Sequence, residues 1–243
     1  MDHDAYLDAI RSESEALLAA AAVDVSRPVP TCPDWTVADL LWHIGRIHHR
    51  WGRIAAEGVT DAAAAGALET PERPADDELV HWARTQADRL LEVLIDLDPD
   101  APRWNWTGAP QTAAFIPRRM AHETAVHRVD AERAAGEASP VDAKLAADGI
   151  DEVLSVLVPA RGDYDGPAGF LGIGETDTSR AWAVHLDPPQ VGLVSPARVP
   201  RRAQPIEQLV GRASEVLLIL WGRDAPKGAG ELARALARHL SGD

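Results

Sequence analysis

Glu123 and His127 form a pair of candidate metal ligands. They are four residues apart in a segment with helical periodicity, so they lie about 40° apart around a helix axis. Ile116 and Met120 fall within about 60° of Glu123, which puts the carboxylate in the middle of the apolar face. An unpaired charge in that place would be very costly, so we expect a partner for Glu123, and His127 is within reach.

His43 is a third candidate ligand, from an earlier segment. Thr36, followed three residues later by Asp39, resembles a capping box with Asp in place of Glu and predicts a helix that runs to about Ala56. His43 borders the apolar face of that helix. One carboxylate and two imidazoles from two inward faces would give a metal three ligands and leave a coordination position open. The alternative for each histidine is a hydrogen-bonded core residue without a metal.

The adjacent pair His122 and Glu123 does not make this chain a metallopeptidase. The HExxH motif of that class needs its two histidines four residues apart on one face of a helix. Here the second histidine, His127, follows the first by five residues, which is about 140° away around the helix. The sequence therefore excludes that motif.

These candidates must be positioned by a mostly helical first part of the chain. Up to about residue 158, apolar residues recur with helical spacing, and loops that contain proline interrupt them. Several long helices with short or moderate loops favour an antiparallel bundle. The predicted helices cover residues 4–22, 36–56, 76–96, 116–136 and 141–158.

The sequence pattern changes after residue 160. The predicted elements there are turns over residues 161–180, strands over 180–187, 191–195 and 205–210, and helices over 213–222 and 231–240. The fold class that we predict is therefore α+β with two domains. The first is a helical bundle over residues 1–159, and the second is a small mixed α/β domain over residues 160–243.

Composition and charge narrow the classes of partner. The chain has 24 Lys and Arg against 38 Asp and Glu, a net charge of −14, which argues against a nucleic acid or an anionic membrane surface. The one cysteine, Cys32, excludes an internal disulfide and the usual multi-cysteine zinc and iron–sulfur sites. The first residues have no secretory signal pattern, and the longest apolar run, residues 216–221, is too short to span a membrane. We expect a soluble, cytoplasmic protein.

Three segments resemble the mycothiol-dependent maleylpyruvate isomerase family. They are CPDWTVADLLWHIGRIHH, MAHETAVHRVDAE and SEVLLILWGR, and they occur in the order that the family has. The resemblance implies a DinB-like antiparallel four-helix bundle followed by a small C-terminal α/β domain. It also implies that His43, Glu123 and His127 are the metal ligands, with zinc as the usual metal. These are the residues that the helical periodicity selected.

The resemblance also implies a reaction. Similar family members take their thiol from mycothiol, the low-molecular-weight thiol of actinobacteria, and a zinc-bound thiol is largely ionised at neutral pH. The thiolate would add to the cis double bond of a maleylpyruvate-like dicarboxylate, and rotation and loss of the thiol would give the trans isomer. One alternative is a transferase that leaves mycothiol attached to an electrophile. Another, of a different class, is a non-catalytic member that binds a metal or small ligand.

Other residues have roles that the sequence leaves open. Arg223, in the WGR motif, is the residue that the resemblance favours for binding the anionic substrate, and a solvated residue at a helix end is the alternative. Trp104 and Trp106 could wall a cofactor pocket or could simply pack. Cys32 could supply a thiolate, although the family uses an external thiol.

Arg119 and Asp130 flank the predicted ligands on the same helix. They could hold the ligands in position from behind, as outer partners of metal-binding residues do. A plain surface ion pair is the alternative for both.

Overall fold

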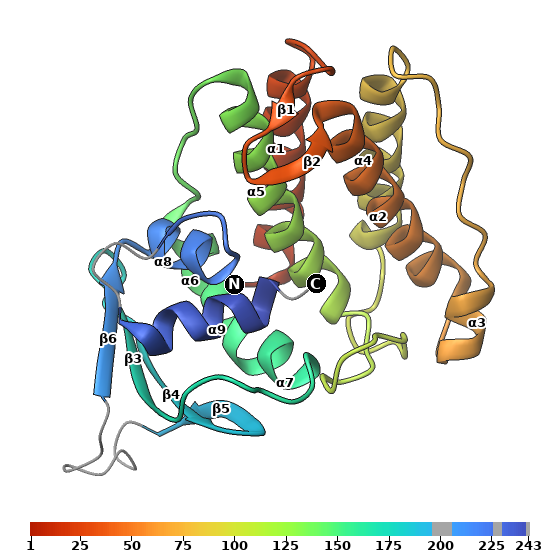
Figure 1. Ribbon diagram of the computed structural model, residues 1–243. Coiled ribbons are helices and arrows are strands. Elements are labelled where there is room, and N and C mark those ends of the chain that lie inside the picture. The colour runs from red at the N-terminus through yellow and green to blue at the C-terminus, as the bar shows by residue number, and fades with distance from the viewer. Residues whose placement is uncertain (196–205, 226–229, 242–243) are drawn as a thin grey trace. The chain divides into compact units, whose positions relative to one another are not determined.

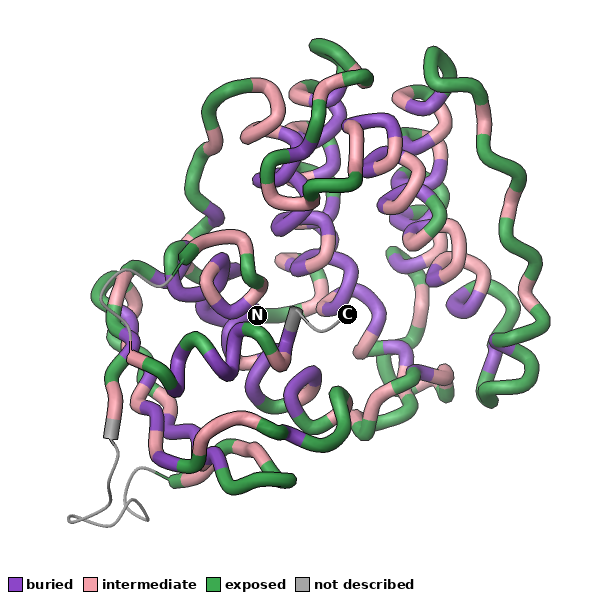
Figure 2. Tube along the Cα trace, in the orientation of Figure 1, coloured by how far each residue is buried: buried purple, intermediate pink, exposed green. Residues whose placement is uncertain are grey.

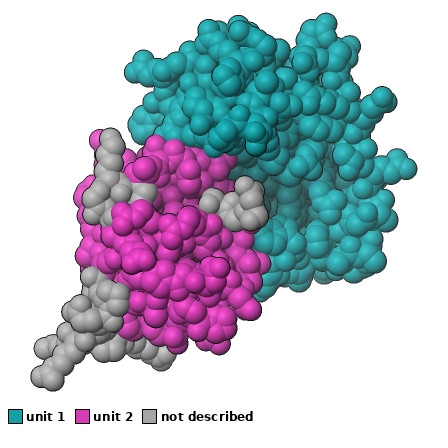
Figure 3. Space-filling view, viewed as in Figure 1, with its two compact units in different colours: residues 1–141 teal, residues 142–243 magenta. Residues whose placement is uncertain are grey.

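The computed structural model describes residues 1–195, 206–225 and 230–241. The chain divides into two compact units, Met1–Val141 and Asp142–Asp243, which Figure 3 shows in different colours. The first is helical and the second contains a sheet with helices, so the predicted α+β class, with a bundle followed by a mixed unit, is confirmed. The boundary between the compact units lies at Val141/Asp142, before the helix over 143–152. The domain boundary expected between residues 159 and 160 stays a prediction.

The long helices α1, α2, α4 and α5 form most of the first unit, and Figure 1 shows how they are arranged. Helix α1 packs against α5 and α4, and α2 packs against α4 and α5, so that the four helices enclose one core. A short hairpin, in which β1 and β2 pair antiparallel, lies between α1 and α2. The elements are α1 (His3–Ala21), β1 (Pro28–Val29), β2 (Cys32–Thr36), α2 (Val37–Glu57), α3 (Ala62–Ala67), α4 (Leu79–Ile95) and α5 (Phe115–Ala135).

Helix α2 begins and ends where its sequence predicts. The backbone N–H of Asp39 donates to Thr36 Oγ1, and the Asp39 carboxylate accepts from the backbone N–H of Thr36 at 2.9 Å, so the predicted capping box is present. The helix ends at Glu57 and is followed by Gly58, whose φ of 67° is the left-handed conformation that glycine adopts without strain.

The core of the bundle consists of the aliphatic faces of its helices. Leu40 of α2, Leu90 of α4 and Ile116 of α5 are all fully buried, and Figure 2 shows buried residues along the inner side of each long helix. Removal of this apolar surface from water is the main favourable term in the folding of the unit. The predicted helical periodicity therefore matches the face that is buried.

The second unit contains a four-stranded sheet with the order β5-β4-β3-β6. Neighbouring strands are antiparallel except β3 and β6, which are parallel. The elements are α6 (Ala143–Glu152), a π-helical turn (Val153–Leu157), α7 (Val158–Ala160), β3 (Gly169–Glu175), β4 (Ala181–Asp187), β5 (Gln190–Val194), β6 (Ile206–Gly211), α8 (Ala213–Leu220) and α9 (Glu231–Ser241).

Strand β3 corrects the prediction that residues 161–180 form turns. Its sequence GFLGIGE places Leu171 and Ile173 on the buried face and Gly172 and Gly174 on the other face. Glycine has low strand propensity, so these residues hide the strand from a reading of the sequence. The pairing with β4 and β6 on both sides outweighs that propensity.

None of the helices that the structure describes is both long and apolar enough to cross a membrane.

Candidate metal centre

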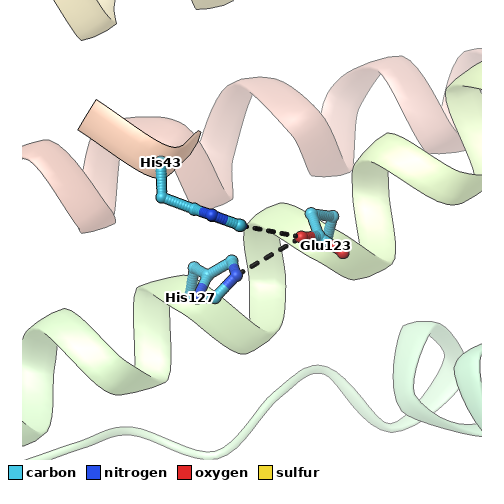
Figure 4. Close-up of side chains that lie close together, drawn as sticks. All are labelled: His43, Glu123 and His127. Carbon is cyan, nitrogen blue, oxygen red and sulfur yellow. Dashed lines mark hydrogen bonds and ion pairs between the residues drawn. The ribbon is translucent and has the colours of Figure 1, made fainter. Parts of the chain in front are cut away.

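The structure brings His43, Glu123 and His127 together inside the first unit. The Nε2 atom of His43 on α2 lies 3.4 Å from Glu123 Oε1, and Nε2 of His127 on α5 lies 3.3 Å from the same oxygen. Figure 4 shows both imidazoles directed at the carboxylate. One ligand atom from each of the three residues lies within 4.8 Å of the other two.

The two separations from Glu123 Oε1 suit a zinc ion. Zinc bonds to imidazole nitrogen and carboxylate oxygen are about 2.0–2.2 Å long, so neighbouring ligand atoms of a tetrahedral site are about 3.3–3.5 Å apart. The nitrogen–oxygen distances of 3.4 Å and 3.3 Å agree with that value. Two imidazoles and one carboxylate also match the ligand types of catalytic zinc sites, which leave the fourth position open.

Arg119 holds the other oxygen of Glu123. Its Nη2 donates to Glu123 Oε2 at 2.8 Å, and only 4% of the arginine side chain is exposed. Burial would raise the pKa of Glu123, but hydrogen bonds to His127 and His43, together with the charge of Arg119, hold that pKa well below its usual value. The carboxyl group is therefore ionised, as a metal ligand must be.

Asp130 and Thr31 hold His127 from the other side. Nδ1 of His127 donates to Asp130 Oδ2 at 2.9 Å, and Thr31 Oγ1 donates to Asp130 Oδ1 at 2.6 Å. A carboxylate can only accept these bonds, so Nδ1 carries a proton and Nε2 is the nitrogen that faces Glu123. Burial would lower the pKa of His127, but the hydrogen bonds to Asp130 and Glu123 outweigh it and raise the pKa.

The protonation of the second histidine differs. Burial lowers the pKa of His43, although its hydrogen bond to Glu123 opposes this effect. The lowered pKa of His43 favours the neutral form that a metal ligand needs, whereas the raised pKa of His127 favours the protonated form and so opposes coordination through Nε2.

A tryptophan of the hairpin lies against both imidazoles. The ring of Trp35 on β2 has its centroid 4.8 Å from that of His43 and 6.2 Å from that of His127. A pocket of about 560 Å³ opens beside His43. Its other lining residues are Asp34, Trp35, Asp39, Trp42, Arg46 and Thr70. A small molecule in this pocket would therefore meet the candidate centre from the side of His43.

Sequence reasoning predicted that His43, Glu123 and His127 would come together but missed the place of Trp35 and Thr31. A signal was available for Trp35, because it directly precedes the capping residue Thr36 and must therefore lie near the first turn of α2. No local signal marks Thr31, whose partner Asp130 is 99 residues further along the chain. The sequence alternative of surface ion pairs for Arg119 and Asp130 is wrong, since both side chains are buried and contact the ligands.

The structure does not place Trp104 and Trp106 in the pocket at His43. The guanidinium carbon of Arg50 lies 6.0 Å from the centre of the Trp104 ring, and Trp106 is 48% exposed. Cys32 lies on β2 and is partly buried. The cofactor-binding role of the two tryptophans stays a prediction.

Arg223 belongs to the second unit, just after α8. Its Nη1 donates to the backbone carbonyl of Trp221 at 2.9 Å, and its side chain is partly buried. A bond to the carbonyl at a helix end agrees with the local electrostatics that favour a cation there. Its role toward a substrate stays a prediction.

The chain is a two-unit α+β protein. Its first unit is a helical bundle with a His–Glu–His cluster on two helices, and its second unit is a mixed α/β fold. The model of the family described as the mycothiol maleylpyruvate isomerase N-terminal domain matches residues 7–132, which is more than half of the chain. The chain belongs to this family, so the predicted family is confirmed.

Two solved structures share the fold. The crystal structure of the mycothiol-dependent maleylpyruvate isomerase is similar with a TM-score of 0.61 and 12% identity over 92% of this chain and 90% of that chain. A histidine-to-alanine mutant of that isomerase gives a TM-score of 0.62 and 12% identity over 94% of this chain and 92% of the other. No curated protein matches the chain.

Proposed function

We propose that this protein is a mycothiol-dependent, zinc-assisted enzyme. In this proposal the mycothiol thiolate attacks an electrophilic small molecule, and the reaction is the cis–trans isomerisation of a maleylpyruvate-like dicarboxylate. The observation that supports it most is the convergence of His43, Glu123 and His127 at zinc-like separations beside a pocket. Membership of the family and the likeness to the isomerase structures support the choice of thiol and reaction.

His43, Glu123 and His127 would hold the zinc ion. Zinc at this position would lower the pKa of a bound thiol and so supply a thiolate at neutral pH. Two neutral imidazoles and one carboxylate leave the bound ion with a net positive charge, which favours an anionic fourth ligand.

The protein's own residues prepare this centre. Arg119 keeps the Glu123 carboxylate ionised and in place, while Asp130 orients the ring of His127. The Trp35 indole covers both imidazoles and keeps part of their surface away from water. Contacts of this kind fix the ligands before any metal binds, so little reorganisation is needed.

The transferase alternative shares the centre and the thiol. In that reaction mycothiol stays attached to the electrophile, whereas an isomerase releases it unchanged. Incubation of the zinc-loaded protein with mycothiol and a set of electrophiles, with analysis of the products, separates the two. A free trans isomer supports the proposal, a stable conjugate supports the transferase, and zinc and thiol binding without turnover supports a non-catalytic member.

Metal content tests the centre directly. The wild-type protein should bind about one equivalent of zinc, and His43→Ala or His127→Ala should abolish this binding because only two ligands remain. Glu123→Gln should weaken zinc affinity markedly, because a neutral amide is a poorer ligand in the same space.

The matched control is His81→Ala on α4, which removes an exposed imidazole and should keep the full zinc content. Zinc content is measured by elemental analysis after dialysis. Full zinc content in both His43→Ala and His127→Ala would overturn the assignment of the centre.

A further inference from the structure

Arginines follow His43 along one face of α2. Arg46, Arg50 and Arg53 come three, seven and ten residues after His43, so they occupy successive turns on the same side of the helix. Arg46 lines the pocket at His43, of about 560 Å³. It also lines a second hollow of about 160 Å³, together with Arg50 and Arg53. The two hollows therefore adjoin at Arg46.

Arg46 and Arg50 have no direct charge partner within the described part of the chain. Neither has a hydrogen bond or ion pair there, although the Arg50 guanidinium lies over the Trp104 ring. Arg53 differs, because it is paired with Glu57. The two guanidinium groups, neither of which has an ion-pair partner, give this hollow a local positive charge, although the whole chain has a net charge of −14.

The acidic residues of the two hollows compensate this charge only in part. Asp39 accepts hydrogen bonds from Thr36 and from Arg73, whose Nη1 lies 2.7 Å from Asp39 Oδ1. The negative charge of Asp39 is therefore neutralised by Arg73. Asp34 lines the first hollow but is exposed, and Glu69 lines the second. A guanidinium without a protein partner that faces a pocket is suited to bind a carboxylate, because its planar fork matches the two oxygens.

We propose that Arg46 binds a carboxylate of the substrate beside the candidate metal centre, and that Arg50 adds a second positive charge behind it. The inference deepens the proposed function and rests on it: it restricts the substrate to electrophiles with a carboxylate near the carbon that is attacked. His43 and Arg46 are about 4.5 Å apart along the axis of α2. A dicarboxylate of four to six carbons, with bonds of about 1.5 Å, is long enough to reach from one to the other.

The test uses the zinc-loaded full chain and maleate, a dicarboxylate with a cis double bond. Calorimetric titration gives the Kd of maleate for the wild type and for Arg46→Gln, Arg46→Lys and Arg84→Gln. Arg46→Gln should raise Kd by roughly 10- to 150-fold, the range for loss of a charge-assisted hydrogen bond. The Kd of Arg46→Lys should lie between those of the wild type and Arg46→Gln, because lysine keeps the positive charge but loses the planar guanidinium.

Arg84→Gln is the matched control, since Arg84 is also an exposed helix arginine and has no hydrogen bond or ion pair among the described residues. Its Kd should equal that of the wild type. The neutral diamide of maleic acid is the second control, and Arg46→Gln should not change its affinity. An unchanged maleate Kd in Arg46→Gln, or no maleate binding by the wild type, would overturn the inference.

Failure of the proposed function gives a different result. If the wild type retains no zinc and does not bind mycothiol, the proposed function is wrong, whatever the maleate titrations show. In that case the same titrations on the metal-free protein still decide whether Arg46 is an anion site. Equal zinc content in wild type and Arg46→Gln excludes an indirect effect through the metal.

Discussion

Single residues behind the ligands determine how ready the candidate centre is for a metal. Asp130 is fully buried and accepts hydrogen bonds from both His127 and Thr31. It therefore keeps the proton of the neutral imidazole on Nδ1 and leaves Nε2 for the metal. Outer partners of this kind typically change metal affinity by about 10- to 100-fold when they are removed.

Asp130→Asn should weaken zinc affinity by about 10- to 100-fold, because a neutral amide no longer stabilises the positive charge that His127 shares with the metal. Competition with a chromophoric chelator measures the affinity. Thr31→Val, which removes only the outer hydrogen bond, should have a smaller effect in the same direction. Thermal unfolding of the metal-free variants reports any general loss of stability, and equal zinc affinity in Asp130→Asn and wild type would contradict the assigned role.

His48 gives the fold a dependence on pH that does not involve the metal. It is 2% exposed, its Nε2 contacts Thr124 Oγ1 at 2.9 Å, and burial lowers its pKa from 6.5 to about 4. Between these two pH values the unfolded chain binds a proton at His48 and the folded chain does not. The free energy of unfolding should therefore fall as pH falls from 6.5 to 4, by up to about 3 kcal/mol from this residue alone.

His48→Gln tests this pH dependence, because glutamine can still donate to Thr124 but does not titrate. Urea unfolding of the metal-free protein from pH 7 to pH 4 should show a shallower loss of stability in His48→Gln than in the wild type. His81→Gln replaces an exposed histidine and should leave the slope unchanged. Parallel curves for His48→Gln and wild type would show that His48 is not the cause.

At the scale of elements, the close approach of α2 and α4 depends on one glycine. A Cβ atom at Gly45 would overlap the indole ring of Trp82, whereas a Cβ at Gly52 would meet α4 only at ordinary contact distance, 3.7 Å from Leu90 Cα. Both glycines lie within α2, so helix propensity affects them equally. The packing of α4 therefore distinguishes two positions that the sequence of α2 alone does not.

Gly45→Ala should destabilise the protein by about 1–3 kcal/mol, because the added methyl group forces Trp82 to move. Gly52→Ala should instead stabilise it, by up to about 1 kcal/mol, through the higher helix propensity of alanine. The difference in the free energy of unfolding between the two variants is the measurement. A gain in stability for Gly45→Ala would show that α2 and α4 do not approach as closely as described.

At the scale of the whole molecule, Arg223 is the residue of the second unit that we predict to bind the substrate. The Arg223 side chain donates to the backbone carbonyl of Trp221, and a cation at a helix end is worth about 0.3–1 kcal/mol of stability. If Arg223 also binds the anionic substrate, Arg223→Ala should lower kcat/KM by roughly 10- to 150-fold, the equivalent of one charge-assisted contact. Zinc content should stay at the wild-type level.

Steady-state kinetics and zinc content of the same Arg223→Ala preparation decide this prediction. Lower activity with zinc intact assigns Arg223 to the substrate, and wild-type kinetics removes it from the site. The double variant with Arg46→Gln adds a further comparison. Independent losses that add as free energies indicate two separate anion contacts, because residues without shared partners act additively.

The sequence alone predicted the features that depend on local geometry. A helix turns by a constant angle per residue, so the spacing of apolar residues was sufficient to place His43, Glu123 and His127 on inward faces. The capping box at Thr36 is equally local, because its partners are three residues apart. The same local rules missed β3, since the glycines of its outer face carry no side chains to show the alternation.

Only the tertiary structure decided which side chains meet. His43 and Glu123 are 80 residues apart, and Thr31 and Asp130 are 99 apart, so their contacts depend on how whole helices and a hairpin pack. That packing is set by the burial of large apolar faces, which is not directional and specifies no individual polar pair in advance. The fold of the first unit therefore determines the distances between His43 and Glu123, the position of Trp35 against His43 and the pocket that Arg46 lines. The sequence alone gives the types of these residues but not their contacts.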